Sequence, residues 1–246
     1  MTRTALLVAA MLIATPALAA ERSFPNTGFT HVIIEGSDDA LIRKGGFSVV
    51  ASGETADLDQ LQVRQEGTTL RIGRKQQGWR LRSKDVQLMI SLPALAAVTV
   101  SGSGDVAVAD QAGAGGDVAL RVSGSGNLAV PAVQARALSA SISGSGNMAV
   151  GGITAETVTT ALSGSGDMAV AGRCTNLDAR LSGSGDLDAA KLGCTGATVA
   201  TSGSGDVSIR ATGTVSARSS GSGDIMVTGG ARCTSRSSGS GTIRCN

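Results

Sequence analysis

The chain has 246 residues, and its 21 Lys and Arg residues nearly balance its 19 Asp and Glu residues. This balance provides no general electrostatic attraction to nucleic acid or to an anionic membrane surface. Aromatic residues make up 2% of the chain, and Tyr is absent. Because aromatic rings usually provide the surface on which nucleic-acid bases stack, we expect no nucleic-acid partner.

The first residues have the pattern of a secretory signal peptide. Arg3 precedes an apolar run over residues 5–13, and the small residues Ala17-Leu18-Ala19 follow. This A-x-A pattern predicts cleavage after Ala19, so we expect residues 1–19 to be removed on export. The apolar run is shorter than the roughly 20 residues of a membrane-spanning helix. We therefore expect no membrane insertion.

Residues 20–97 follow an irregular pattern, which predicts less regular coils that cap the upstream end of the fold. Residues 35–42 are a degenerate copy of the repeat that dominates the rest of the chain. Residues 55–61 suit a short helical turn, and alternating residues on both sides of Glu66-Gly67 predict a hairpin. Residues 85–92 are expected to form a further strand.

A basic segment, residues 71–84, interrupts this cap. It contains six Lys and Arg residues and the only Trp of the chain. An exposed ring among cations can contact an anionic envelope polymer through charge and cation–π interactions. The alternative is a solvated loop whose Trp covers an open end of the fold. The candidate binding residues are Arg74, Lys75, Trp79, Arg80 and Arg82.

From residue 98 to residue 246 the chain repeats the string Ser-Gly-Ser-Gly-Asp or a close variant eight times. The strings begin at Ser101, Ser123, Ser143, Ser163, Ser182, Ser202, Ser220 and Ser238. Their spacing is 22, 20, 20, 19, 20, 18 and 18 residues. A repeat of this length is typical of one coil of a solenoid, and we expect one continuous domain with residues 20–97.

Apolar residues alternate on both sides of each string, as in Val106 and Val108 after the first string and Leu120 and Val122 before the second. Alternation places these side chains on one face of a strand. We therefore predict an all-β fold, a single-stranded parallel β-helix that coils as a right-handed solenoid with about 20 residues per coil. Neighbouring coils should pair in parallel about 4.8 Å apart.

In such a stack the residue that ends each string forms a ladder of Asp and Asn along one edge. Like charges so close together repel unless they are hydrogen-bonded or bound to a cation. A calcium ladder through Asp167, Asp186, Asp206 and Asp224 is one interpretation. We favour the other, in which each side chain accepts a backbone N–H within its own turn and no cofactor is needed.

Carboxylate catalysis is a further possibility, because Asp186 and Asp188 lie on one strand face and Asp167 lies one coil away. Two carboxylates within reach are the minimum for cleavage of a glycosidic bond. The chain offers a single His and no long loop beside these residues to build a cleft. We therefore predict no enzymatic activity and keep a carbohydrate-active enzyme that acts on an acidic polysaccharide as the alternative.

Four Cys in an exported chain suggest two disulfides. Cys174 and Cys194 each stand eight residues before the next Ser-Gly-Ser-Gly string, so a stack brings them together. Cys233 and Cys245 fall on inward positions of the final coils, where a bridge would pin the C-terminal end. Zinc is the alternative, but no Cys-x-x-Cys pair is present.

Outward Ala residues of successive coils predict a flat stripe that could pack against another protein or a second copy of the chain. The stripe comprises Ala107, Ala129, Ala149 and Ala169. The alternative is that small residues merely suit the wall of a narrow coil.

The repeated strings, preceded by Leu88-Met89-Ile90-Ser91-Leu92-Pro93 and by Val98-Thr99-Val100, resemble the bacterial head GIN domain family of auto-transporter adhesins. The resemblance begins near Phe29 and implies an exported β-helix with a surface or adhesive role and no catalytic residues. This sequence departs from a true autotransporter, because it shows no C-terminal membrane barrel of alternating strands and aromatic girdles, so we do not expect self-transport across an outer membrane. We therefore expect the periplasm, with the cell surface or the medium as the other destinations.

Together these patterns predict a non-catalytic, adhesin-like binding or structural module of the cell envelope. The partner would be an envelope polymer or a surface protein, and self-association is a further possibility.

Overall fold

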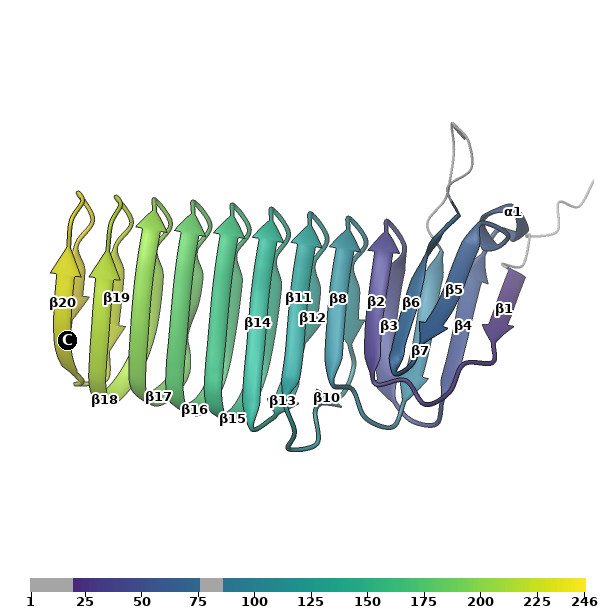
Figure 1. Ribbon diagram of the computed structural model, residues 1–246, viewed down its shortest axis with the longest axis horizontal. Coiled ribbons are helices and arrows are strands. Elements are labelled where there is room, and N and C mark those ends of the chain that lie inside the picture. Colours follow the sequence, from purple (N-terminus) through teal and green to yellow (C-terminus); the bar gives the residue numbers. More distant parts are fainter. Residues whose placement is uncertain (1–19, 76–85) are drawn as a thin grey trace, which may run out of the picture.

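A computed structural model describes residues 20–75 and 86–246. These residues form an elongated rod of coiled strands (Figure 1). The signal peptide expected at residues 1–19 lies outside the described residues. Within the two described ranges, no helix has the length and hydropathy that crossing a bilayer requires.

The regular part of the rod is a parallel β-solenoid, as the repeats predict. Its strands are β8 (Ala97–Gly102), β9 (Val106–Val108), β10 (Gln111–Ala112), β11 (Val118–Gly124), β12 (Leu128–Val130), β13 (Ala132–Gln134), β14 (Ala137–Gly144), β15 (Met148–Gly164), β16 (Met168–Gly183), β17 (Leu187–Gly203), β18 (Val207–Ser219), β19 (Ile225–Thr228), β20 (Arg232–Ser237) and β21 (Ile243–Cys245). Strands one coil apart pair in parallel, so that Met148 lies beside Met168 and Gly164 beside Gly183. Apart from register shifts within β15 to β18, the pairing places the residues of one repeat next to their equivalents in the next repeat.

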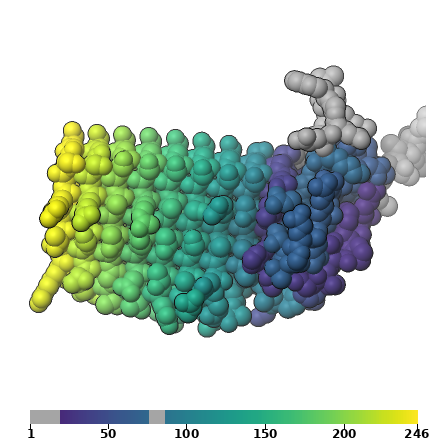
Figure 2. Space-filling model, in the orientation of Figure 1, coloured from purple at the N-terminus to yellow at the C-terminus, as the bar shows by residue number. Residues whose placement is uncertain are grey.

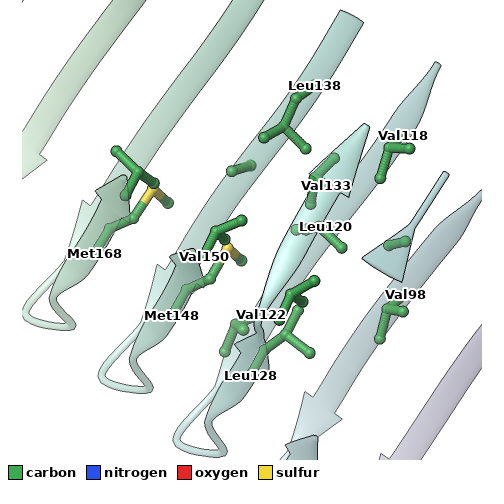
Figure 3. Close-up of a cluster of buried hydrophobic side chains, with 14 of the residues drawn as sticks. Val98, Val118, Leu120, Val122, Leu128, Val133, Leu138, Met148, Val150 and Met168 are labelled. Atoms are coloured by element: carbon green, nitrogen blue, oxygen red, sulfur yellow. The ribbon is translucent and has the colours of Figure 1, made fainter. Parts of the chain in front are cut away.

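The interior of the rod contains the alternating apolar residues that the sequence predicts. Figure 3 shows Leu128, Met148 and Met168 on successive coils, with their side chains in the core. All three are at most 2% exposed, and Leu120 and Val122, from the run before the second string, are buried to the same degree. The core is thus a continuous column of Val, Leu, Ile, Met and Ala side chains, stacked coil upon coil.

The two glycines of each Ser-Gly-Ser-Gly string are required by the corner that they form. Gly164 has a φ of +128°, in the region that side chains disfavour. A Cβ atom at Gly166 would lie 1.9 Å from the carbonyl oxygen of Gly146 on the preceding coil. Close approach of one corner to the next therefore excludes any side chain at this second position.

The N-terminal section is built from β1 (Ala20–Phe24), β2 (His31–Gly36), β3 (Asp39–Lys44), β4 (Ser48–Gly53), α1 (Thr55–Leu58), β5 (Leu61–Glu66), β6 (Thr69–Arg74) and β7 (Gln87–Leu92). Strand β2 pairs in parallel with both β6 and β8, and β3 pairs with both β7 and β9. The degenerate repeat at residues 35–42 is thus a coil of the stack. Strands β6 and β7 pair with its N-terminal side and lie further from the regular repeats along the rod (Figure 1).

Antiparallel strands end the stack at this side. Strand β4 pairs antiparallel with β1 and with β7, and β5 forms a hairpin with β6. The hairpin turns at Gly67, whose φ is +57°, and its prediction is confirmed. The helical turn expected over residues 55–61 is shorter and ends at Leu58. Among the described residues, strand β1 is the outermost of the antiparallel series β7, β4 and β1.

Both disulfides pair as the repeat phase predicts. Cys174 and Cys194 lie in register on β16 and β17, with their Cα atoms 4.6 Å apart. Cys233 and Cys245 have Cα atoms 6.5 Å apart and join β20 to β21. They occupy the positions that two buried valines hold in the coil beneath, Val215 and Val227. The second bridge therefore crosses the open C-terminal end of the core.

We expect Gly166→Ala to destabilise the rod by about 1–3 kcal/mol, because the new methyl group overpacks the corner. Gly116→Ala is the matched control, since a Cβ atom there would meet nothing within 4 Å. Thermal unfolding followed by circular dichroism measures both effects. Equal stability of the two variants would contradict the close approach described for Gly166.

Removal of the terminal bridge in a Cys233→Ser/Cys245→Ser variant should loosen the last coil. Loss of a disulfide that closes so short a loop costs about 2–3 kcal/mol. Hydrogen exchange at β20 and β21 should accelerate, whereas a Cys174→Ser/Cys194→Ser variant should leave these strands protected. Acceleration of the same size in both variants would show that the bridge has no local effect.

Candidate binding faces of the rod

The Asp and Asn residues that follow the corners form a hydrogen-bonded ladder between coils. The Oδ1 atom of Asp167 accepts the backbone N–H of Asp186 at 2.9 Å, and Oδ1 of Asp186 accepts that of Asp206 at 2.8 Å. The same contact joins Asp39, Asp105, Asn127, Asn147, Asp167, Asp186, Asp206, Asp224 and Thr242 in order.

This ladder differs from the expectation that each side chain accepts an N–H within its own turn. The physical reason is the parallel register, which brings equivalent residues of neighbouring coils to about 4.8 Å. At this distance a short Asp or Asn side chain reaches the backbone of the next coil. The carboxylates are therefore structural acceptors that link one coil to the next.

The ladder ends at Asp224, whose Oδ1 accepts both the backbone N–H and the hydroxyl of Thr242, at 2.8 and 2.9 Å. These two hydrogen bonds lower the pKa of Asp224 below its ordinary value, and the positive charge of Arg244 adds to the effect. The ionised carboxylate is thus the form that the folded chain prefers.

The four carboxylates considered for calcium, Asp167, Asp186, Asp206 and Asp224, all belong to this ladder. Among residues 20–75 and 86–246, no group of three or more His, Cys, Asp or Glu side chains converges as a metal site requires. Calcium binding therefore stays the less favoured of the two interpretations of the ladder.

The three carboxylates of the enzyme alternative do share one shallow groove. Asp167, Asp186 and Asp188 line a depression of about 550 Å³ together with Ala149 and Ala169. The Oδ1 atom of Asp188 accepts the N–H of Ala190 at 3.1 Å. All three side chains rise from the same sheet face, whereas glycoside cleavage needs carboxyl groups that flank the bond.

An apolar column runs beside this ladder, on the face predicted to carry an Ala stripe. Leu41 and Met89 extend the column toward the N-terminal section, at 39% and 41% exposed. The alanines in register on successive coils are Ala107, Ala129, Ala149 and Ala169.

Two of the predicted binding residues of the basic segment fall within the described chain. Arg74 forms ion pairs with Asp38 and Asp57, whose side chains are 1% and 7% exposed. The Nζ atom of Lys75 donates to the backbone oxygen of Asp59 at 2.9 Å. Arg74 thus has a structural role, because its positive charge compensates the buried negative charges of Asp38 and Asp57. A role of Arg74 in binding a partner stays a prediction. The other three candidates, Trp79, Arg80 and Arg82, lie outside the described residues.

A groove that sequence reasoning missed lies on the sheet face that precedes the Ser-Gly-Ser-Gly corners. It has a volume of about 1190 Å³ and contains three arginines, Arg180, Arg218 and Arg236, beside a column of serines. The signal was present in the sequence, because each of these arginines stands two residues before a Ser-Gly-Ser-Gly string. Figure 2 shows how equivalent positions form regular rows along the rod.

The lowered pKa of Asp224 predicts a pH-dependent contribution to stability. This contribution is complete above the ordinary value of 3.8 and is lost as the pH falls through the lower folded-state pKa. Asp224→Asn keeps an oxygen for Thr242 but does not titrate. In thermal unfolding, the advantage of the wild type over Asp224→Asn should therefore shrink below pH 3.8. A difference that is independent of pH would contradict this assignment.

Comparison with solved structures finds the same fold in other proteins. A putative lipid binding protein from Parabacteroides distasonis is 22% identical, with a TM-score of 0.85 over 92% of this chain and 96% of that one. A putative adhesin from Parabacteroides merdae is 17% identical, with a TM-score of 0.87 over 92% and 95%. At these identities the likeness establishes the fold alone. Among curated proteins, none matches the chain.

The model of one protein family covers most of the chain. The family is described as putative auto-transporter adhesin, head GIN domain, and the match spans residues 28–231. The resemblance expected from about Phe29 onward is thereby confirmed. The chain belongs to the head GIN domain family of putative auto-transporter adhesins.

Proposed function

We propose that the protein is an exported, adhesin-like binding module without catalytic activity, located in the periplasm. Its partner is a cell-envelope polymer or a surface protein, held along the outer faces of the rod. The family description and the adhesin name of a structural relative support this proposal.

The observation that carries the proposal is the register of the coils. Because equivalent residues stack, one kind of side chain recurs along the rod at intervals of about 4.8 Å. The alanines at positions 107, 129, 149 and 169 and the Asp and Asn ladder are examples. A surface that repeats in this way suits a repetitive or extended partner, because many weak contacts act together.

The same geometry disfavours the enzyme alternative. Asp167 and Asp186 each use one carboxylate oxygen to join neighbouring coils, and Asp188 uses one to accept a nearby N–H. Their positions are therefore explained by the architecture. An acidic polysaccharide lying in this groove would meet all three carboxylates from one side.

The test uses the mature chain, residues 20–246, with intact cells, isolated envelope polymers and lipid vesicles. We expect saturable binding to cells or polymers, and no release of new reducing ends from an acidic polysaccharide. Loss of binding on addition of a calcium chelator would support the calcium ladder. Retention by none of the surfaces would overturn the proposal.

Asp186→Asn separates a structural carboxylate from a catalytic one. Asn retains an oxygen for the N–H of Asp206 but cannot act as a general acid or a nucleophile. We expect this variant to fold and bind as the wild type does. Turnover of polysaccharide by the wild type, abolished in Asp186→Asn, would establish the enzyme instead.

A further inference from the structure

One outward column of the rod concentrates positive charge toward the C-terminal end. Parallel pairing places Ala161, Arg180, Ala200, Arg218 and Arg236 in register on successive coils. All three arginines are exposed. The small alanines on either side of Arg180 leave the guanidinium groups accessible from the groove.

Two of these arginines have no built-in counterion. Arg180 pairs with Asp178 at 2.8 Å, from the neighbouring column. The residues in register with Asp178 on the coils of Arg218 and Arg236 are Ser216 and Thr234. Within the described ranges, neither Arg218 nor Arg236 forms an ion pair. Because they occupy adjacent coils about 4.8 Å apart, their mutual repulsion favours an anion between or above them.

The groove beside this column runs across successive coils and therefore along the rod. Its volume is about 1190 Å³, and its other side is a column of serines that includes Ser163, Ser182 and Ser202. Guanidinium groups bind carboxylates through paired hydrogen bonds, and serine hydroxyls both donate and accept. A chain that carries carboxylates and hydroxyls at regular intervals matches both columns.

The composition of this face distinguishes between classes of anionic partner. No aromatic residue of the described chain lines the groove, which disfavours stacking with nucleic-acid bases. The exposed large hydrophobic residues of the described chain, Leu41, Phe47, Met89 and Met226, are not among its lining residues. None of these large apolar side chains is therefore available in the groove to insert into a membrane, which disfavours a lipid partner at this site.

We propose that this groove binds a linear acidic polysaccharide, with Arg218 and Arg236 holding its carboxylates. The inference rests on the proposed binding function and names its ligand class.

The experiment measures binding of the mature chain to immobilised polygalacturonate, with neutral dextran as the uncharged comparison. The test variant is Arg218→Ala/Arg236→Ala. The matched control is Arg173→Ala/Arg210→Ala, which removes the same charge from exposed arginines outside the groove. Thermal unfolding verifies that both variants fold, and sedimentation reports their oligomeric state.

We expect the test variant to bind polygalacturonate at least about tenfold more weakly, since one charge-assisted hydrogen bond contributes about a factor of ten. The control should bind as the wild type does, and dextran should bind to neither. Equal loss in both variants would overturn the assignment to this groove. Vesicles of anionic lipid are a third surface, and binding of the wild type to them without binding to polygalacturonate would overturn the ligand class. A change in oligomeric state in the test variant alone would overturn it too.

Failure of this inference can be told from failure of the proposed function. A wild type that is retained by cells or envelope polymers but not by polygalacturonate overturns the inference alone. A wild type that is retained by none of them overturns both.

Discussion

The parallel pairing of each coil with the next is the interaction on which the rest of the structure depends. Backbone hydrogen bonds set the spacing of the coils, and that spacing leaves no room for a side chain at Gly166. The same spacing lets Asp167 reach the N–H of Asp186 and brings Cys174 to Cys194. The glycine corners, the Asp and Asn ladder and the Cys174–Cys194 disulfide are therefore all consequences of the constant spacing between neighbouring coils.

The parallel register also gathers acidic and basic side chains into separate columns, although the two kinds of charge nearly balance in the chain as a whole. The Asp and Asn ladder lies just after the Ser-Gly-Ser-Gly corners, whereas Arg180, Arg218 and Arg236 lie just before them. Acidic and basic columns thus occupy the two sides of one corner. A net charge of +2 conceals this division, because composition does not record which face a residue occupies.

Much of the regular rod could be predicted from sequence, because a period of about 20 residues and an alternation of two determine which side chains point inward. Val106, Leu128 and Met148 are buried for this reason. The place of β2 between β6 and β8 could not be predicted, since it depends on pairing between distant segments. The Asp38–Arg74 ion pair follows from that placement, and Asp38 stands where a regular string has its second Gly.

The position of β2 between β6 and β8 has a consequence for the order in which the chain folds. A chain is synthesised from its N-terminus, so β2 is made before either of its partners. Strand β2 gains its second parallel neighbour only after residues 97–102 are available, whereas each later coil pairs with the coil made immediately before it. Contacts between distant segments form slowly because of the entropy of loop closure. We therefore expect the N-terminal section to assemble more slowly than the regular repeats, which can extend one coil at a time.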